Sequence, residues 1–217
     1  MSDWHRYIVD LEADASEAPA LAARLDAWLV DERILDAQRC TVHGETFRRP
    51  GNRAGLALVP LAGCEHDELG GWTRDTPEAP SAGRAGGAIG RWSSRQHVRR
   101  DFWPAGANEV SVSVQRGCWF PVEPPWTLAC PACGVEFEPE ESFTEAIGEW
   151  YDRHSDGPVP CPACGHIQPI VDWDGPSPHG VGEFALNFMN WPPLSDRFIG
   201  RVADLLGHRV RVVYTRM

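Results

Sequence analysis

Four cysteines in the second half of the chain have the residue type and the spacing to bind a metal ion. The pentapeptide CPACG occurs twice, which gives the pattern C-x2-C-x27-C-x2-C. In each copy the proline fixes one backbone angle, and the glycine permits the tight turn that directs two sulfurs toward one point. Two such pairs supply the four thiolates of a closed tetrahedral Zn²⁺ site. The predicted ligands are Cys130, Cys133, Cys161 and Cys164.

The two knuckles, CPACG at 130–134 and CPACG at 161–165, resemble those of the zinc-ribbon family. The resemblance covers only an insertion, residues 124–175, and implies one structural zinc ion on a small β-hairpin scaffold without implying a reaction. The gap between the knuckles is longer than in a plain ribbon, because "SFTE" at 142–145 is a capping box that predicts a short helix. The helical spacing predicts that Phe143, Ile147 and either Trp150 or Tyr151 face the interior.

Three other interpretations of these cysteines stay open. The knuckles also resemble rubredoxin-type iron sites, and four thiolates accept either metal, so the sequence alone does not separate zinc from iron. A C-x-x-C redox pair is the second alternative, although one shared ion explains two matched units more simply. Disulfides are disfavoured, because the N-terminal sequence "MSDWHRYIVDLEAD" lacks a secretion signal. Four protein ligands leave no position for water, so the predicted site stabilises structure and does not catalyse.

The remaining cysteines lie outside this pattern. "CTVH" contains Cys40 and His43, and "CEH" contains Cys64 and His66, so either pair could belong to a second metal site or act as nucleophile and base. Lone cysteines usually behave as small buried apolar residues, however. We therefore expect these two, together with Cys118, to be structural.

Residues 62–107 are expected to form a long irregular connection that is rich in glycine, proline and serine, and its stretch 83–100 contains five arginines with no acidic residue among them. Connections of this length often carry function. Indole and guanidinium groups could bind a partner protein, sugars or bases, although packing within the segment explains the tryptophans more simply. The interaction candidates are Trp72, Arg91, Trp92, Arg95, Arg99, Arg100 and Trp103.

Charge and hydropathy exclude some classes of function. A formal net charge of −11 argues against loose binding to nucleic acid or to anionic membranes, since the field of the whole molecule repels both. No apolar run approaches the roughly 18 residues of a membrane span, so a cytoplasmic protein that binds no membrane is expected. The sequence leaves the oligomeric state open.

Recognisable catalytic motifs are absent from the sequence. "GRAGGAIG" at 83–90 does not match a phosphate-binding loop, and neither H-E-x-x-H nor G-x-S-x-G occurs. The first hypothesis is therefore a zinc-binding, non-catalytic adaptor, regulator or inhibitor that binds another protein. The second is an enzyme that acts on a small anionic substrate in a pocket between the sheet and the long connection. Its candidate residues are His43, His66, His97, Arg91 and Arg95. A nucleic-acid-binding protein is the third.

The elements that must position these residues are clearest at the two ends of the chain. "RYIVDL" at 6–11 predicts a strand, and a helix capped by Ser16 follows over about residues 17–31. Near the other end, "EFALNFMN" at 183–190 predicts a strand. A helix then runs from Ser195 to Gly207, and a strand follows it at 208–215. In this last strand Val210, Val212 and Tyr214 share one face.

Two further strands are expected between these ends. "NEVSVSVQ" at 108–115 places Val110, Val112 and Val114 on the inner face, and "AGLALVPL" at 54–61 is a second candidate. The expected fold class is α+β, with ferredoxin-like β-α units at both ends and both helices on one face of a sheet. Residues 1–123 and 176–217 form this domain, and residues 124–175 are the inserted zinc ribbon.

Overall fold

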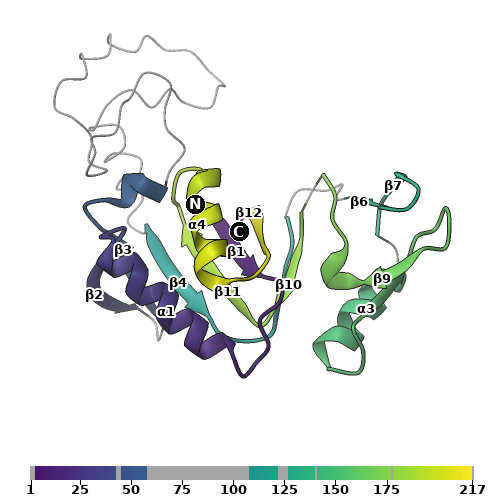
Figure 1. Cartoon of the computed structure of the whole chain (residues 1–217), viewed down its shortest axis with the longest axis horizontal. Coiled ribbons are helices and arrows are strands. Elements are labelled where there is room, and N and C mark those ends of the chain that lie inside the picture. The colour runs from purple at the N-terminus through teal and green to yellow at the C-terminus, as the bar shows by residue number, and fades with distance from the viewer. Residues whose placement is uncertain are drawn as a thin grey trace, which may run out of the picture. The chain divides into compact units, whose positions relative to one another are not determined.

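The structure is a computed structural model, and it describes residues 3–42, 45–57, 108–121, 127–139, 141–176 and 178–216 (Figure 1). The expected connection at 62–107 lies outside the described residues. The same is true of all seven Trp and Arg interaction candidates and of the histidines proposed for the enzyme, His43, His66 and His97.

The described part of the chain is mixed α and β, with three α-helices. The helices are α1 (Ala18–Asp31), α3 (Glu141–Tyr151) and α4 (Asp196–Leu206), and two 3-10 turns are η1 (Ala54–Ala57) and η2 (Ile170–Asp172). The strands are β1 (Trp4–Asp10), β2 (Leu35–Val42), β3 (Glu45–Pro50), β4 (Glu109–Ser113), β5 (Gly117–Trp119), β6 (Leu128–Ala129), β7 (Glu136–Phe137), β8 (Pro158–Pro160), β9 (Ile167–Pro169), β10 (Gly180–Gly182), β11 (Phe184–Met189) and β12 (Val210–Arg216).

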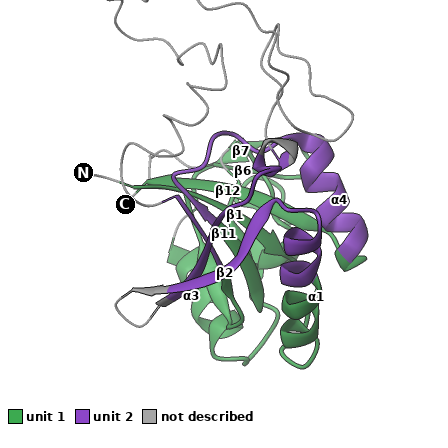
Figure 2. Ribbon diagram, turned by 90° about the vertical axis from the view of Figure 1, so that its left-hand side faces the viewer, with its two compact units in different colours: residues 1–24, 112–187, 206–217 green, residues 25–111, 188–205 purple. Residues whose placement is uncertain are grey.

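The chain divides into two compact units, which Figure 2 shows in different colours. Unit 1 comprises residues 1–24, 112–187 and 206–217, and unit 2 comprises residues 25–111 and 188–205. Unit 1 therefore contains both cysteine knuckles together with the two terminal strands, β1 and β12.

In unit 1 the strands follow the order β12-β1-β11, and β1 and β12 pair antiparallel over their whole length. Tyr7 lies opposite Val213 in this pairing. Tyr7, Val9, Ala185 and Val213 form a buried cluster, against which Leu11 packs. The predicted terminal strands are thus confirmed.

The predicted inner face of β12 is wrong. Val213 and Thr215 are buried, whereas Tyr214 is 45% exposed. Valine occurs at both 212 and 213, so the sequence pattern does not choose between the two faces. The choice is made by tertiary packing, because Val213 shares its face with Tyr7 and the core cluster.

A buried carboxylate closes the turn after β1. Asp10 is fully buried and accepts hydrogen bonds from the backbone N–H groups of Glu12 and Ala13, each at 2.9 Å. Its other oxygen lies 2.9 Å from Nδ1 of His208, in the turn that leads into β12. These contacts satisfy a charged group that would otherwise be costly to bury.

In unit 2, β3 pairs antiparallel with β2 and with β4, where Arg48 lies opposite Val110. The helical residues Leu25, Leu29, Phe198 and Val202 are buried. Of the predicted inward valines of β4, only Val110 is buried, because the strand ends at Ser113 and Val114 is 43% exposed.

Capping residues explain the helix boundaries. Ser195 caps α4 as predicted, since its hydroxyl accepts the N–H of Phe198 at 3.2 Å, and Gly207 ends the helix with a φ of 78°. At α1 the capping group is Asp14, not Ser16. The Asp14 carboxylate accepts the backbone N–H groups of Ser16 and Glu17, at 2.7 and 2.9 Å.

The strand expected at 54–61 is not found in its described half. Ala54–Ala57 form the 3-10 turn η1, and residues 58–61 lie outside the described part of the chain. The turn begins where the N–H of Ala54 donates to the carbonyl of Gly51. Local bonding of this kind replaces the strand pairing that the apolar pattern suggested.

Candidate metal centre

The four predicted cysteines lie together, as the spacing of the two knuckles requires. One ligand atom from each, its Sγ, lies within 4.8 Å of all the others. The Sγ atoms of Cys130 and Cys164 are 3.7 Å apart, and those of Cys133 and Cys161 are 3.8 Å apart. A tetrahedron of sulfurs around an ion at about 2.3 Å has edges of about 3.8 Å. The cluster can therefore hold one metal ion.

Each cysteine pair sits on its own two-stranded hairpin, β6–β7 for the first and β8–β9 for the second. The two knuckle turns have the same backbone hydrogen bonds. The N–H of Cys130 donates to the carbonyl of Val135 at 2.9 Å, and the N–H of Cys161 donates to that of His166 at 2.7 Å. The repeated pentapeptide thus folds twice into one geometry.

The glycine of each knuckle is required by its backbone angle. Gly134 and Gly165 have φ values of 73° and 74°, in the left-handed region that side chains disfavour. A Cβ at either position would meet nothing within 4 Å. The left-handed backbone conformation, rather than a lack of room for a side chain, therefore explains why glycine occupies both positions.

One sulfur of each knuckle faces the interior and the other faces solvent. Cys130 and Cys161 are each 2% exposed, whereas Cys133 and Cys164 are exposed. The outer sulfurs each accept one backbone N–H, from Val135 in the first knuckle and from His166 in the second. These donors stabilise the thiolate form that a metal requires.

The thiols influence one another's protonation. Burial raises the pKa of Cys161. The hydrogen bonds from backbone N–H groups and from the sulfurs of Cys130 and Cys164 together have the larger effect and lower this pKa to about 7. At Cys164 the N–H of His166 lowers the pKa, while desolvation and the other three sulfurs outweigh that effect and raise it to about 12. Four sulfurs this close cannot all ionise without a cation, so metal binding must displace protons.

A separate hydrophobic core supports the cysteine cluster. Trp173 is fully buried, packs edge-to-face against Phe137 at 5.3 Å and donates its indole N–H to the carbonyl of Gln168 at 3.2 Å. The buried members of this core are Leu128, Cys130, Phe143, Ala146, Trp150, Val159, Cys161, Ile170, Trp173 and Val181. Both inner cysteines, Cys130 and Cys161, belong to it, so the packing of this core positions two of the four sulfurs.

The helix predicted between the knuckles is confirmed as α3. Phe143, Ala146 and Trp150 are buried on its inner face. Trp150 and not Tyr151 is the inward aromatic, because Tyr151 is 53% exposed. The extra length of the gap therefore supplies three side chains of the core to which Cys130 and Cys161 belong.

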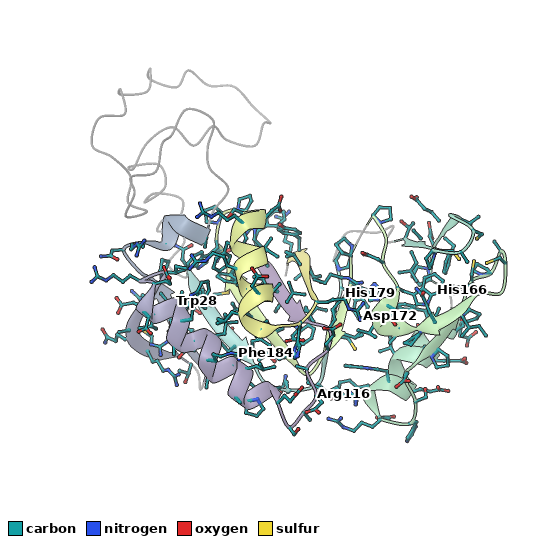
Figure 3. All side chains as sticks on the ribbon, in the orientation of Figure 1. Trp28, Arg116, His166, Asp172, His179 and Phe184 are labelled. Carbon is teal, nitrogen blue, oxygen red and sulfur yellow. The ribbon has the colours of Figure 1, made fainter. Side chains whose placement is uncertain are left out.

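A buried histidine that sequence reasoning missed lies at the edge of this core (Figure 3). His179 is fully buried, stacks on Phe120 at 6.0 Å and meets Phe143 edge-to-face at 5.3 Å. Burial, assisted by the charge of Arg211, lowers its pKa to about 4. The surrounding sequence "PSPHG" contains no periodic pattern that could have identified it.

Two arginines of the β12 segment connect the terminal strands with the segment that carries the cysteines, residues 127–175, here named the cysteine module. All of these residues belong to unit 1. Arg211 donates through Nη1 to the carbonyl oxygens of Trp173 at 2.7 Å and His179 at 3.0 Å. Arg209 contacts Asp172 at 3.1 Å and Glu12 at 2.6 Å. The cysteine module is thus bonded to β12 through groups next to its own core.

A second connection within unit 1 involves a buried carboxylate. Glu183, with 8% of its side chain exposed, lies 2.9 Å from Arg153 and 3.5 Å from Arg116. The guanidinium of Arg116 also lies over the ring of Trp150, 4.0 Å from its centroid. Through its contact with Trp150, Arg116 couples α3 to the segment that leads into β5.

The remaining cysteines do not join the cluster. Cys40 is partly exposed in β2, and Cys118 is partly buried with its pKa raised by burial to about 11. Cys64, like His43 and His66, lies outside the described residues. Among the residues that the structure describes, the four knuckle cysteines are the one group of three or more metal-binding side chains.

Among the described residues, no helix combines the length and the apolar character needed to cross a membrane.

Comparisons with known proteins add no family to this geometry. Neither the models of protein families, nor the curated proteins, nor the solved structures give a match to this chain.

Proposed function

We propose that this protein is a zinc-binding, non-catalytic interaction protein, in which residues 124–175 form a zinc-ribbon module made rigid by the metal. The observation that carries the proposal is the arrangement of four sulfurs within 4.8 Å of one another, with 3.7 and 3.8 Å in two cross-knuckle pairs. Two hairpins with one shared geometry present them. A site of this type needs no further ligand.

Zinc is the favoured metal because four thiolates without an open position are the usual ligand set of structural zinc sites. Iron in the same tetrahedron is the second candidate. The two metals are separated by the visible absorption of the purified protein, since an iron–thiolate site is coloured and a zinc site is not. A thiolate site also suits a reducing compartment such as the cytoplasm, where disulfides do not compete for the sulfurs.

The exposed surface of the cysteine module supports an interaction role. The two outer cysteines are exposed, and the knuckle turns around them are exposed as well. The four sulfurs fill a tetrahedron, which argues against metal-based catalysis. A rigid, metal-stabilised surface is suited to binding another protein, as an adaptor or a regulator requires.

The body that carries this module is proposed to be ferredoxin-like. β1 lies between β11 and β12, so the β11–α4–β12 unit has another strand between its two strands. This arrangement is the one expected for a split β-α-β unit. Determination of the experimental structure would test it through the direction of β11 relative to β12.

Metal analysis of the purified full chain is the first test of the proposed function. We expect one zinc per chain, measured by elemental mass spectrometry, and a protein without iron absorption. A preparation with neither zinc nor iron at stoichiometric amounts would refute the metal centre. For the interaction role, affinity capture by metal-loaded and chelator-treated protein should differ, with partners retained only by the loaded form.

A further inference from the structure

The two knuckle turns carry exposed apolar residues beside the cysteines, and this set is here named the knuckle tip. Its apolar members are Pro131, Ala132, Val135, Pro162, Ala163 and Ile167, all of them exposed. Val135 is 41% exposed and Ile167 is 62% exposed, the highest value among the large apolar residues that the structure describes. Apolar side chains this exposed on a rigid turn are a feature of binding surfaces.

The surroundings of the knuckle tip are strongly acidic. Residues 124–175 contain ten carboxylates and one guanidinium, a formal charge of −9 out of −11 for the whole chain. The one arginine, Arg153, is bound to Glu183 at 2.9 Å. Four thiolates around a divalent ion add a further net negative charge. Almost the entire excess of negative charge is therefore concentrated in the segment that carries the tip.

Exposed carboxylates of the same segment are available to a partner. Glu136 and Glu138 directly follow the first knuckle and are exposed, and Glu141 and Glu145 continue along α3. Within the described part of the chain, none of these four carboxylates forms an ion pair.

The outer sulfurs add acceptors at the centre of the tip. Cys133 and Cys164 are exposed and each accept one backbone N–H, whereas the inner Cys161 accepts two, from Ala163 and Cys164. An exposed thiolate with remaining acceptor capacity favours a charged N–H donor. Lysine and arginine supply such donors, and both have apolar stems that can pack on the tip.

We propose that the knuckle tip is a docking site for a protein segment in which arginine or lysine is adjacent to aliphatic side chains. The inference rests on the proposed function and names the chemistry of its partner. Charge complementarity favours a cationic segment and disfavours nucleic acid, whose phosphates the −9 segment repels. The aliphatic residues of the partner would cover Val135 and Ile167.

A random dodecapeptide library displayed on phage, selected against the full metal-loaded chain, tests the proposal. Enriched peptides should combine arginine or lysine with leucine, isoleucine or valine. For a synthetic peptide from this set, Ile167→Ser should raise the Kd about ten-fold, because the isoleucine side chain becomes buried on binding and serine forfeits that apolar burial. The double variant Glu136→Gln with Glu138→Gln should also weaken binding and reduce its dependence on salt. The control Val114→Ser, at a position 43% exposed outside the module, should leave the Kd unchanged.

Metal content is measured in every variant, so that loss of the cysteine site is not mistaken for loss of the docking surface. Three results would each overturn the proposal: no enriched peptide, enriched peptides without cationic residues, or peptides that bind Ile167→Ser as well as the native chain. Displacement of the peptide by a DNA or RNA oligonucleotide would overturn it too. In all of these cases a zinc-dependent partner captured from cells would still support the proposed function, so the two failures are distinguishable.

Discussion

The Sγ atom of Cys133 lies 3.8 Å from that of Cys161, although 28 positions separate the two residues in the sequence. Cys133 is exposed and Cys161 is buried, so this contact joins the surface of the cysteine module to its core. A metal ion at this position would therefore link the two hairpins, β6–β7 and β8–β9.

Removing one outer ligand should release the metal. We expect Cys133→Ser to lose its zinc during dialysis against a chelator that leaves the native chain loaded, as measured by elemental mass spectrometry. Metal removal withdraws on the order of 10 kcal/mol of folding free energy from a small zinc module. The tryptophan fluorescence should shift to the red as Trp150 and Trp173 become exposed. Cys40→Ser is the matched control, and an equal loss of zinc in that variant would contradict the assignment of ligands.

Protonation of His179 should destabilise the fold in acid. The pKa is about 4 in the folded chain, below the ordinary 6.5, so its contribution is complete above pH 6.5 and is lost as the pH falls toward 4. The shift corresponds to about 3 kcal/mol. The variant His179→Phe cannot titrate, and its stability should fall less between pH 7 and pH 4 in urea denaturation. Identical pH profiles for the two proteins would show that the histidine is not buried in its neutral form.

The turn between α3 and β8 should not tolerate a side chain at Gly157. Its φ is 63°, and an added Cβ would lie 2.6 Å from the backbone oxygen of Ala146. We expect Gly157→Ala to lower the free energy of unfolding by about 2 kcal/mol or more, measured by chemical denaturation. Gly148 is the control within α3, because a Cβ there meets nothing within 4 Å. Gly148→Ala should instead stabilise the protein by about 0.5 to 1 kcal/mol.

Neutralising Glu183 should cost more than removing the exposed end of its network, Arg153. In Glu183→Gln the guanidinium of Arg116, with 17% of its side chain exposed, loses its buried counter-charge. The expected destabilisation is about 3 kcal/mol. Arg153, by contrast, has 56% of its side chain exposed. Arg153→Gln should therefore cost less than about 1 kcal/mol, and equal effects of the two substitutions on the unfolding midpoint would argue against this network.

Features encoded by local sequence could be predicted. The positions of Cys130 and Cys133 relative to each other follow from proline and glycine in a five-residue turn, and the knuckle was therefore predictable in both copies. The same is true of α3 and of the Ser195 cap, since each depends on residues within one or two helical turns. The cysteine cluster was accessible to sequence reasoning because its geometry is built from two local motifs.

Features that depend on tertiary contacts could not be predicted in this way. The inner face of β12 is decided by the pairing of Val213 with Tyr7, and valine stands on both faces of that strand. His179 is buried by Phe120 and Phe143, which are distant in sequence. Arg211 donates to the backbone carbonyl groups of two residues. Every residue has such a group, so no sequence pattern marks these contacts. Such residues are recognised only once the chain is folded.

The split between inner and outer cysteines has a consequence for how the metal would enter and leave. Cys130 and Cys161 are each 2% exposed, so a competing chelator meets Cys133 and Cys164 first. Exchange would then proceed stepwise from one side, with the inner pair releasing the ion last. The rate of metal exchange would be set by the opening of the hydrophobic core around those two sulfurs, not by the affinity of the outer ones.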